Sequence, residues 1–177
     1  MSDGQDRSLQ MLSTALELEK KGKNFYDKAV STCHDAVGRE IFRMLMKDEI
    51  MHMDRIQKIY ESLKAGETWS DEWKSIEPGH KDLGVLFREM VSDHGKDITA
   101  KTSDIEALDV GIDLESRAIT FYQGHLSKAD DSLEREFLEH IITEEKGHHA
   151  ALSDMKLYLS DPAAWFVEQE HPGLDGA

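Results

Sequence analysis

The chain has 177 residues, with 36 acidic against 21 basic side chains and a formal net charge of −15 at pH 7. This length suits one domain with a substantial core, so we expect a single domain over residues 1–177. So acidic a composition disfavours nucleic acid and anionic membrane surfaces as partners.

The sequence predicts a cytoplasmic protein without a membrane segment. The first residues contain no apolar run of the kind that signal peptides have, and no stretch of about 18 uncharged apolar residues occurs. Cys33 is the single cysteine. Neither an internal disulfide nor a metal site of several thiolates can therefore form, which fits a reducing compartment.

Apolar residues at helical spacing predict two helices in the first part of the chain. The first covers about 8–31, with Ser8 as its N-cap, and the second covers about 35–65. Gly66 is placed to end the second helix as a left-handed C-cap. The short connection between the two predicts antiparallel neighbours.

Residues 66–101 lack helical periodicity and contain Pro78 and several glycines, which predicts a long crossover. Within it, "LGVLFREMV" (83–91) is a candidate short helix. The crossover also holds Trp69 and Trp73. We expect these two side chains on the outside of the helices or in a dimer contact.

Two further helices are predicted over about 103–128 and 131–160. Ser103 with Glu106, and Asp131 with Glu134, have the spacing of a capping box. In the tail, 161–177, two of the three prolines occur, so we expect regular helix to end near Ser160. Two short connections and one long one predict an all-α fold, a ferritin-like antiparallel four-helix bundle with a long crossover between its second and third helices.

Each of these four helices carries a glutamate on the apolar stripe that should face the core. On the second and fourth helices a histidine follows the glutamate at a spacing of three. The two halves of the chain repeat the pattern, and "ELEKKGKNFY" (17–26) corresponds to "DLESRAITFY" (113–122). The six residues predicted to point inward are Glu19, Glu49, His52, Glu115, Glu145 and His148.

Carboxylates in a dry core are costly unless paired, so these six residues predict a metal centre. Residues three apart share a helix face, so each Glu-x-x-His pair can bind one ion. Four carboxylates balance two divalent cations, and oxygen with imidazole donors favours two iron ions, with manganese as the alternative. We expect Glu49 and Glu145 to bridge the two ions. The set matches that of ferritin-like di-iron and di-manganese proteins.

Four neighbouring residues are candidates for supporting roles. Tyr26 and Tyr122 each follow a predicted ligand by seven residues and are candidate proton donors, with ordinary core packing as the alternative. Asp48 and Glu144 each directly precede a predicted ligand. We expect each of them to accept a hydrogen bond from the outer ring nitrogen of the histidine on the other helix.

The segments "ALELEKKGKNFY", "LMKDEIMH", "DLESRAITFY" and "ITEEKGHH" resemble the rubrerythrin branch of the ferritin-like superfamily. The resemblance covers about residues 9–159 and implies a non-haem di-iron centre, reduction of peroxide or oxygen, and homodimers. Rubrerythrins usually add a rubredoxin module with two cysteine pairs, which Cys33 alone cannot form. They usually also carry two glutamates three apart on the third helix, where Ile112 and Ala118 flank Glu115 here. In this respect the six ligands are closer to those of bacterioferritin.

We therefore expect a di-iron oxidoreductase that reduces hydrogen peroxide or oxygen. Its electrons should come from a separate donor such as rubredoxin, because the chain has no cysteine cluster, haem-attachment motif or nucleotide-binding glycine loop. One alternative is a ferroxidase or iron-storage subunit of a large cage, which solution size would distinguish from a dimer. Another is a metal-free helical interaction module.

Overall fold

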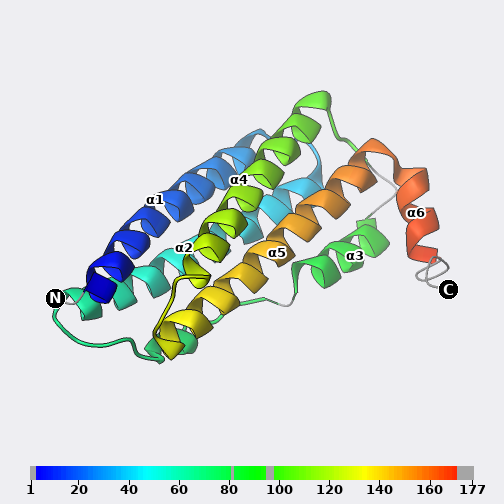
Figure 1. The fold of residues 1–177 in the computed structure, drawn as a ribbon. Helices are drawn as coiled ribbons and strands as arrows, with labels where there is room; N and C mark the ends of the chain where they lie inside the picture. Colours follow the sequence, from blue (N-terminus) through cyan, green and yellow to red (C-terminus); the bar gives the residue numbers. More distant parts are fainter. Residues whose placement is uncertain (1–2, 81, 95–97, 171–177) are drawn as a thin grey trace.

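A computed structural model describes residues 3–80, 82–94 and 98–170. Every regular element in these ranges is a helix, which confirms the all-α prediction (Figure 1). The four long helices are α1 (Asp3–Thr32), α2 (Ala36–Lys64), α4 (Thr102–Leu126) and α5 (Ser132–Ser160). The shorter ones are the 3-10 helix η1 (Glu72–Ser75), α3 (Leu83–His94) and α6 (Pro162–Glu170).

The long helices pack in two pairs, α1 with α2 and α4 with α5, and the pairs meet where α1 contacts α4 and α2 contacts α5. Each pair is joined by a short connection and therefore runs antiparallel (Figure 1). Between α2 and α4 the chain passes through η1 and α3 back to the opposite end of the long helices (Figure 1). η1 contacts α2, and α3 contacts both α2 and α5.

The buried apolar side chains form two clusters along the long helices. One contains Leu45 of α2 and Leu152 of α5, and the other contains Ile56 of α2 and Ile141 of α5. Between these positions each helix carries its Glu-x-x-His pair. The apolar clusters therefore close off both ends of a short polar stretch in the middle of the helices.

Several helix ends agree with the sequence prediction. Gly66 follows α2 with a φ of +86°, and its amide donates to the Leu63 carbonyl at 3.0 Å. Such a left-handed residue is the usual role of glycine at a helix C-terminus. Asp131 is the N-cap of α5, where its side chain accepts from the Leu133 and Glu134 amides. The candidate helix at 83–91 is present as part of α3.

Two predicted N-terminal capping residues were wrong. α1 begins at Asp3, so Ser8 lies within the helix, and its buried hydroxyl donates to Glu134 at 2.9 Å. At α4, Asp104 rather than Ser103 makes the capping contact, because its carboxylate accepts from the Lys101 amide at 2.9 Å.

The prediction for the tail also needs correction, because residues 162–170 form α6. Proline is tolerated at the first position of a helix, where its missing N–H is not needed, and Pro162 occupies that position. The Asp161 carboxylate accepts from the Ala164 amide at 3.0 Å. The buried Trp165 holds the helix in place against Phe87 and Tyr158. The rest of the tail, 171–177, lies outside the described residues.

Trp69 and Trp73 are buried rather than exposed on the outside of the helices. Both rings pack against Phe137 at the start of α5. They therefore cover the end of one apolar cluster from within the same chain. In the described residues, no helix has both the length and the apolar content that crossing a membrane requires.

Candidate metal centre

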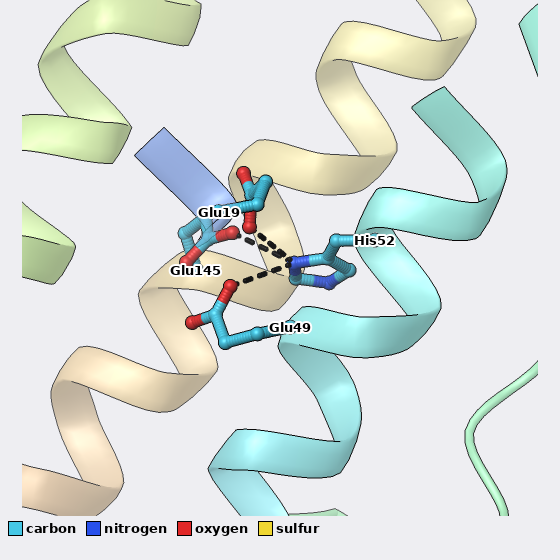
Figure 2. A group of neighbouring side chains, drawn as sticks. All are labelled: Glu19, Glu49, His52 and Glu145. Atoms are coloured by element: carbon cyan, nitrogen blue, oxygen red, sulfur yellow. Dashed lines mark hydrogen bonds and ion pairs between the residues drawn. The ribbon is translucent and has the colours of Figure 1, made fainter. Parts of the chain in front are cut away.

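The six side chains predicted to point inward meet midway along α1, α2, α4 and α5, and all are at most 4% exposed. Their donor atoms form two overlapping groups, within each of which the atoms lie within 4.8 Å of one another. The first group is Glu19, Glu49, His52 and Glu145 (Figure 2), and the second is Glu49, Glu115, Glu145 and His148. Glu49 and Glu145 belong to both groups. They thus occupy the positions that bridging ligands need.

Each histidine turns its Nδ1 atom toward the centre. The Nδ1 atom of His52 lies 3.0 Å from Glu145 Oε1 and 3.2 Å from Glu19 Oε2 (Figure 2). The Nδ1 atom of His148 lies 3.4 Å from Glu145 Oε2 and 3.7 Å from Glu115 Oε2. The two rings are stacked, with centroids 5.5 Å apart. Each donor group therefore holds one imidazole and three carboxylates.

The outer Nε2 atoms of the histidines meet carboxylates from the opposite helix. His52 Nε2 on α2 lies 3.1 Å from Glu144 on α5, and His148 Nε2 on α5 lies 3.2 Å from Asp48 on α2. These are the two crossed contacts that the sequence predicted. An Nε2–H that donates to a carboxylate leaves Nδ1 free for a metal and fixes the ring orientation.

Sequence reasoning missed two residues that contact these outer carboxylates. Arg55, which is 2% exposed, donates to Glu144 at 2.5 Å, and His80 lies 2.7 Å from Asp48. Burial acts to raise the pKa of Glu144, but the bonds from His52 and Arg55 outweigh it and lower that pKa to about 2. Arg55 follows His52 by three residues, and this spacing predicts that both lie on the same face of the helix. His80 lies in an irregular segment, where no periodicity could place it.

Two tyrosines complete the inner layer. The Tyr26 hydroxyl on α1 donates to Glu115 on α4, and the Tyr122 hydroxyl on α4 donates to Glu19 on α1. Burial and the nearby carboxylates raise the pKa of both tyrosines well above the usual value. Both hydroxyls therefore keep their protons at neutral pH and orient the carboxylates that they contact.

Electrostatics in the metal-free centre favour bound protons. Burial and the charge of Glu145 raise the pKa of Glu115 to about 8, and burial with the charge of Glu19 raises that of Glu49. Burial acts to raise the pKa of Glu145 as well, but a hydrogen bond from Glu115 and the nearby histidines hold it well below the usual value. For His52, burial lowers the pKa, but Glu145 and other carboxylates raise it well above the usual value. Bound metal would displace these protons.

The chemistry of this centre fits metal ions. Among the described residues, no hydrogen bond of regular geometry reaches Glu145 Oε1 or His148 Nδ1, although both atoms are buried. Buried polar atoms without a well-aligned hydrogen bond are costly, and both atoms belong to residues of the donor groups. Carboxylate and imidazole donors without thiolate suit iron or manganese. The ligand role of the six residues stays a prediction, now with compatible geometry.

In a comparison with known protein families, residues 10–156 match a family model described as Rubrerythrin. The chain belongs to the rubrerythrin family. The matched residues include the whole of both donor groups. Comparisons with curated proteins and with solved structures found no match.

The pKa shifts of this rubrerythrin-family centre predict a pH dependence of stability. Glu115 binds a proton in the folded metal-free chain up to about pH 8, whereas the unfolded chain releases it near the ordinary value of about 4.5. The stability of the metal-free protein should therefore fall as the pH rises through this range. The raised pKa of His148 acts in the same direction. Its contribution to stability is complete below the pKa of the unfolded state and is lost as the pH rises through the pKa of the folded state. The lowered pKa of Glu145 matters only in acid.

Denaturation in urea at several pH values between about 5 and 8, with chelator and with excess Mn²⁺, tests this prediction. With chelator the midpoint should decrease as the pH rises, whereas stabilisation by Mn²⁺ should increase because the metal competes with protons. The Glu115→Gln variant, which cannot ionise at that position, should show a shallower decrease. A midpoint that rises with pH in chelator would contradict the proton-holding centre.

Gly22 on α1 predicts a second effect, because a Cβ atom there would lie 3.2 Å from both Cδ and Oε1 of Glu49. Gly22→Ala should displace this carboxylate and weaken metal binding about tenfold, the order expected when the surroundings of a ligand change. Gly124→Ala on α4 is the matched control, because its Cβ would meet nothing within 4 Å. Titration with Mn²⁺ against a chelator measures both variants. Unchanged affinity in Gly22→Ala would show that Glu49 is not held there by close packing.

Proposed function

We propose that this chain is a non-haem di-iron oxidoreductase that reduces hydrogen peroxide or oxygen. The observation that carries the proposal is the pair of overlapping donor groups that share Glu49 and Glu145. Membership of the rubrerythrin family supports it. The packing of the four long helices supports the expected ferritin-like bundle with its crossover between α2 and α4.

Two iron ions, when bound, supply the two electrons that reduction of one peroxide molecule requires. Six side chains would hold them, and two of these belong to both donor groups. Six ligand residues would leave coordination positions open on two iron ions. A small oxidant could bind at these positions. The two apolar clusters on either side exclude bulk water from it.

Reduction of peroxide to water also consumes two protons, and we propose Tyr26 and Tyr122 as residues that hold protons beside the centre. Each hydroxyl is buried and donates to one carboxylate that is a member of a single donor group. In this arrangement the tyrosines keep Glu115 and Glu19 oriented. They also offer a proton on each side of the space between the two groups.

The proposal includes a separate electron donor, such as a rubredoxin-like protein, and a homodimeric assembly. Cys33 is the single cysteine of the chain, and it is buried among apolar residues. Burial also raises its pKa to about 11, which suppresses the reactive thiolate. The chain therefore has no thiol-based redox centre of its own beside the metal site.

The test is an anaerobic titration of ferrous-loaded protein with hydrogen peroxide, followed by the spectrum of the oxidised iron. One peroxide should oxidise about two ferrous ions, because each iron gives one electron. Solution size is measured on the same sample. Ferrous iron that reacts with neither hydrogen peroxide nor oxygen would overturn the proposal, and a particle of roughly two dozen chains would overturn it in favour of iron storage.

A further inference from the structure

The segment 76–80, between η1 and α3, contacts the outer side of the candidate metal centre at two points. At the first point, Arg55 Nε donates to the Ile76 carbonyl at 2.7 Å. The same guanidinium donates from Nη1 to Glu144 at 2.5 Å, and Glu144 accepts from His52 Nε2 at 3.1 Å. A continuous chain of hydrogen bonds thus joins the backbone of the segment to the histidine of the first donor group.

The second point of contact is His80. Its Nε2 atom lies 2.7 Å from Asp48 Oδ1, and Asp48 Oδ2 lies 3.2 Å from His148 Nε2. Each oxygen of this carboxylate thus serves a different histidine. This second series of hydrogen bonds leads to the second donor group. It shares no residue with the series that runs through Arg55 and Glu144.

The two connections differ in their surroundings. Arg55 is buried and permanently charged. His80 is 16% exposed and lines a cavity of about 200 Å³ that also reaches Asp48, Glu144 and His148. Pro78, which also lines this cavity, restricts the backbone between the two points. The segment therefore makes one buried contact through Arg55 and one partly exposed contact through His80.

We propose that segment 76–80 positions the two metal-binding histidines separately, with His80 acting through Asp48 on His148, and Ile76 acting through Arg55 and Glu144 on His52. This inference rests on the di-metal centre of the proposed function. His80 and Arg55 are positioning residues, because neither lies in a donor group. Each one serves one metal position and not the other.

The physical reason is that a carboxylate with one bond fewer can turn. Without His80, Asp48 keeps its contact with His148 but loses the partner that fixes its other oxygen. His148 Nδ1 is then aligned less well with its donor group. Outer partners of this kind typically contribute about ten- to a hundredfold in metal affinity.

The experiment titrates chelator-treated protein with Co²⁺ and follows the visible absorption of the bound ion. Wild type should bind two ions. His80→Ala should weaken one of the two binding steps about tenfold and leave the other unchanged, and His80→Gln, which keeps a donor, should recover part of the loss. Glu77→Ala, an exposed position in the same segment, is the control and should behave as wild type.

A double-mutant cycle assigns the effect to one position. In a His148→Ala background only the first donor group keeps its histidine, so adding His80→Ala should change the remaining affinity by less than about twofold. Adding Arg55→Lys to the His148→Ala background should weaken the remaining Co²⁺ affinity. The inference is overturned if His80→Ala weakens both steps equally, weakens neither, or acts by the same factor in the His148→Ala background. A wild-type protein that binds no Co²⁺ would instead refute the di-metal centre itself.

Discussion

Replacement of Glu145 by alanine should abolish stable metal binding at both positions. Glu145 belongs to both donor groups, so its loss removes a ligand from each ion at once. Glu49→Ala should do the same for the same reason. Metal analysis after anaerobic ferrous loading and desalting should give close to two irons for wild type and almost none for either variant. Circular dichroism of the same samples shows whether the helices persist.

Two controls on α5 show whether the register of this helix is right. Glu139→Ala changes an exposed position and should leave the iron content at its wild-type value. Glu144→Ala removes the partner of His52 Nε2 and should weaken only the first position. If Glu144→Ala lost both ions while Glu145→Ala retained them, the assignment of the bridging ligand would be wrong.

The supply of electrons should decide whether the protein turns over. A di-iron centre that has reduced one peroxide is ferric and must be reduced again before it can react further. We expect a single turnover per site when ferrous-loaded protein receives peroxide alone. With rubredoxin, its reductase and NADH, consumption of NADH should continue for many turnovers. Spectrophotometry of NADH measures this difference directly.

The controls for this assay follow from the site. The same mixture with Glu145→Ala should consume NADH only at the background rate, because that variant loses a residue of both donor groups and should bind no stable pair of ions. Sustained turnover from NADH and the wild-type chain alone would contradict the need for a separate donor. If no donor sustained turnover, the ferroxidase alternative would gain support.

The candidate centre was predictable because a helix fixes which side chains share a face. Glu49 and His52 interrupt an apolar stripe at a spacing of three. Because that stripe faces the core, these two side chains also point toward the core. Asp48 was predictable for a related reason. A residue directly before a ligand is turned about 100° around the helix, which on α2 directs it toward His148 on the neighbouring α5.

Other features depend on tertiary contacts that no periodicity encodes. His80 reaches Asp48 from an irregular segment, and its place depends on how that segment folds back over α2. Trp165 stabilises α6 by packing on Phe87, which comes from a distant part of the chain. Ser8 resembles an N-cap in the sequence, but its hydroxyl meets a carboxylate that is far away in the chain. In these cases the partner that is distant in the sequence, and not the local sequence pattern, decides which contact the side chain makes.

The most direct test of the account is the iron content of the wild-type protein, because every chemical step depends on a two-ion centre in the space between Glu49 and Glu145. The protein is freed of metal with chelator, loaded anaerobically with ferrous iron, separated from excess iron and analysed for iron per chain. Close to two irons per chain are expected for wild type, and both should be absent from Glu145→Ala. A folded chain that retains no iron, or that retains the same iron after Glu145→Ala, would contradict it.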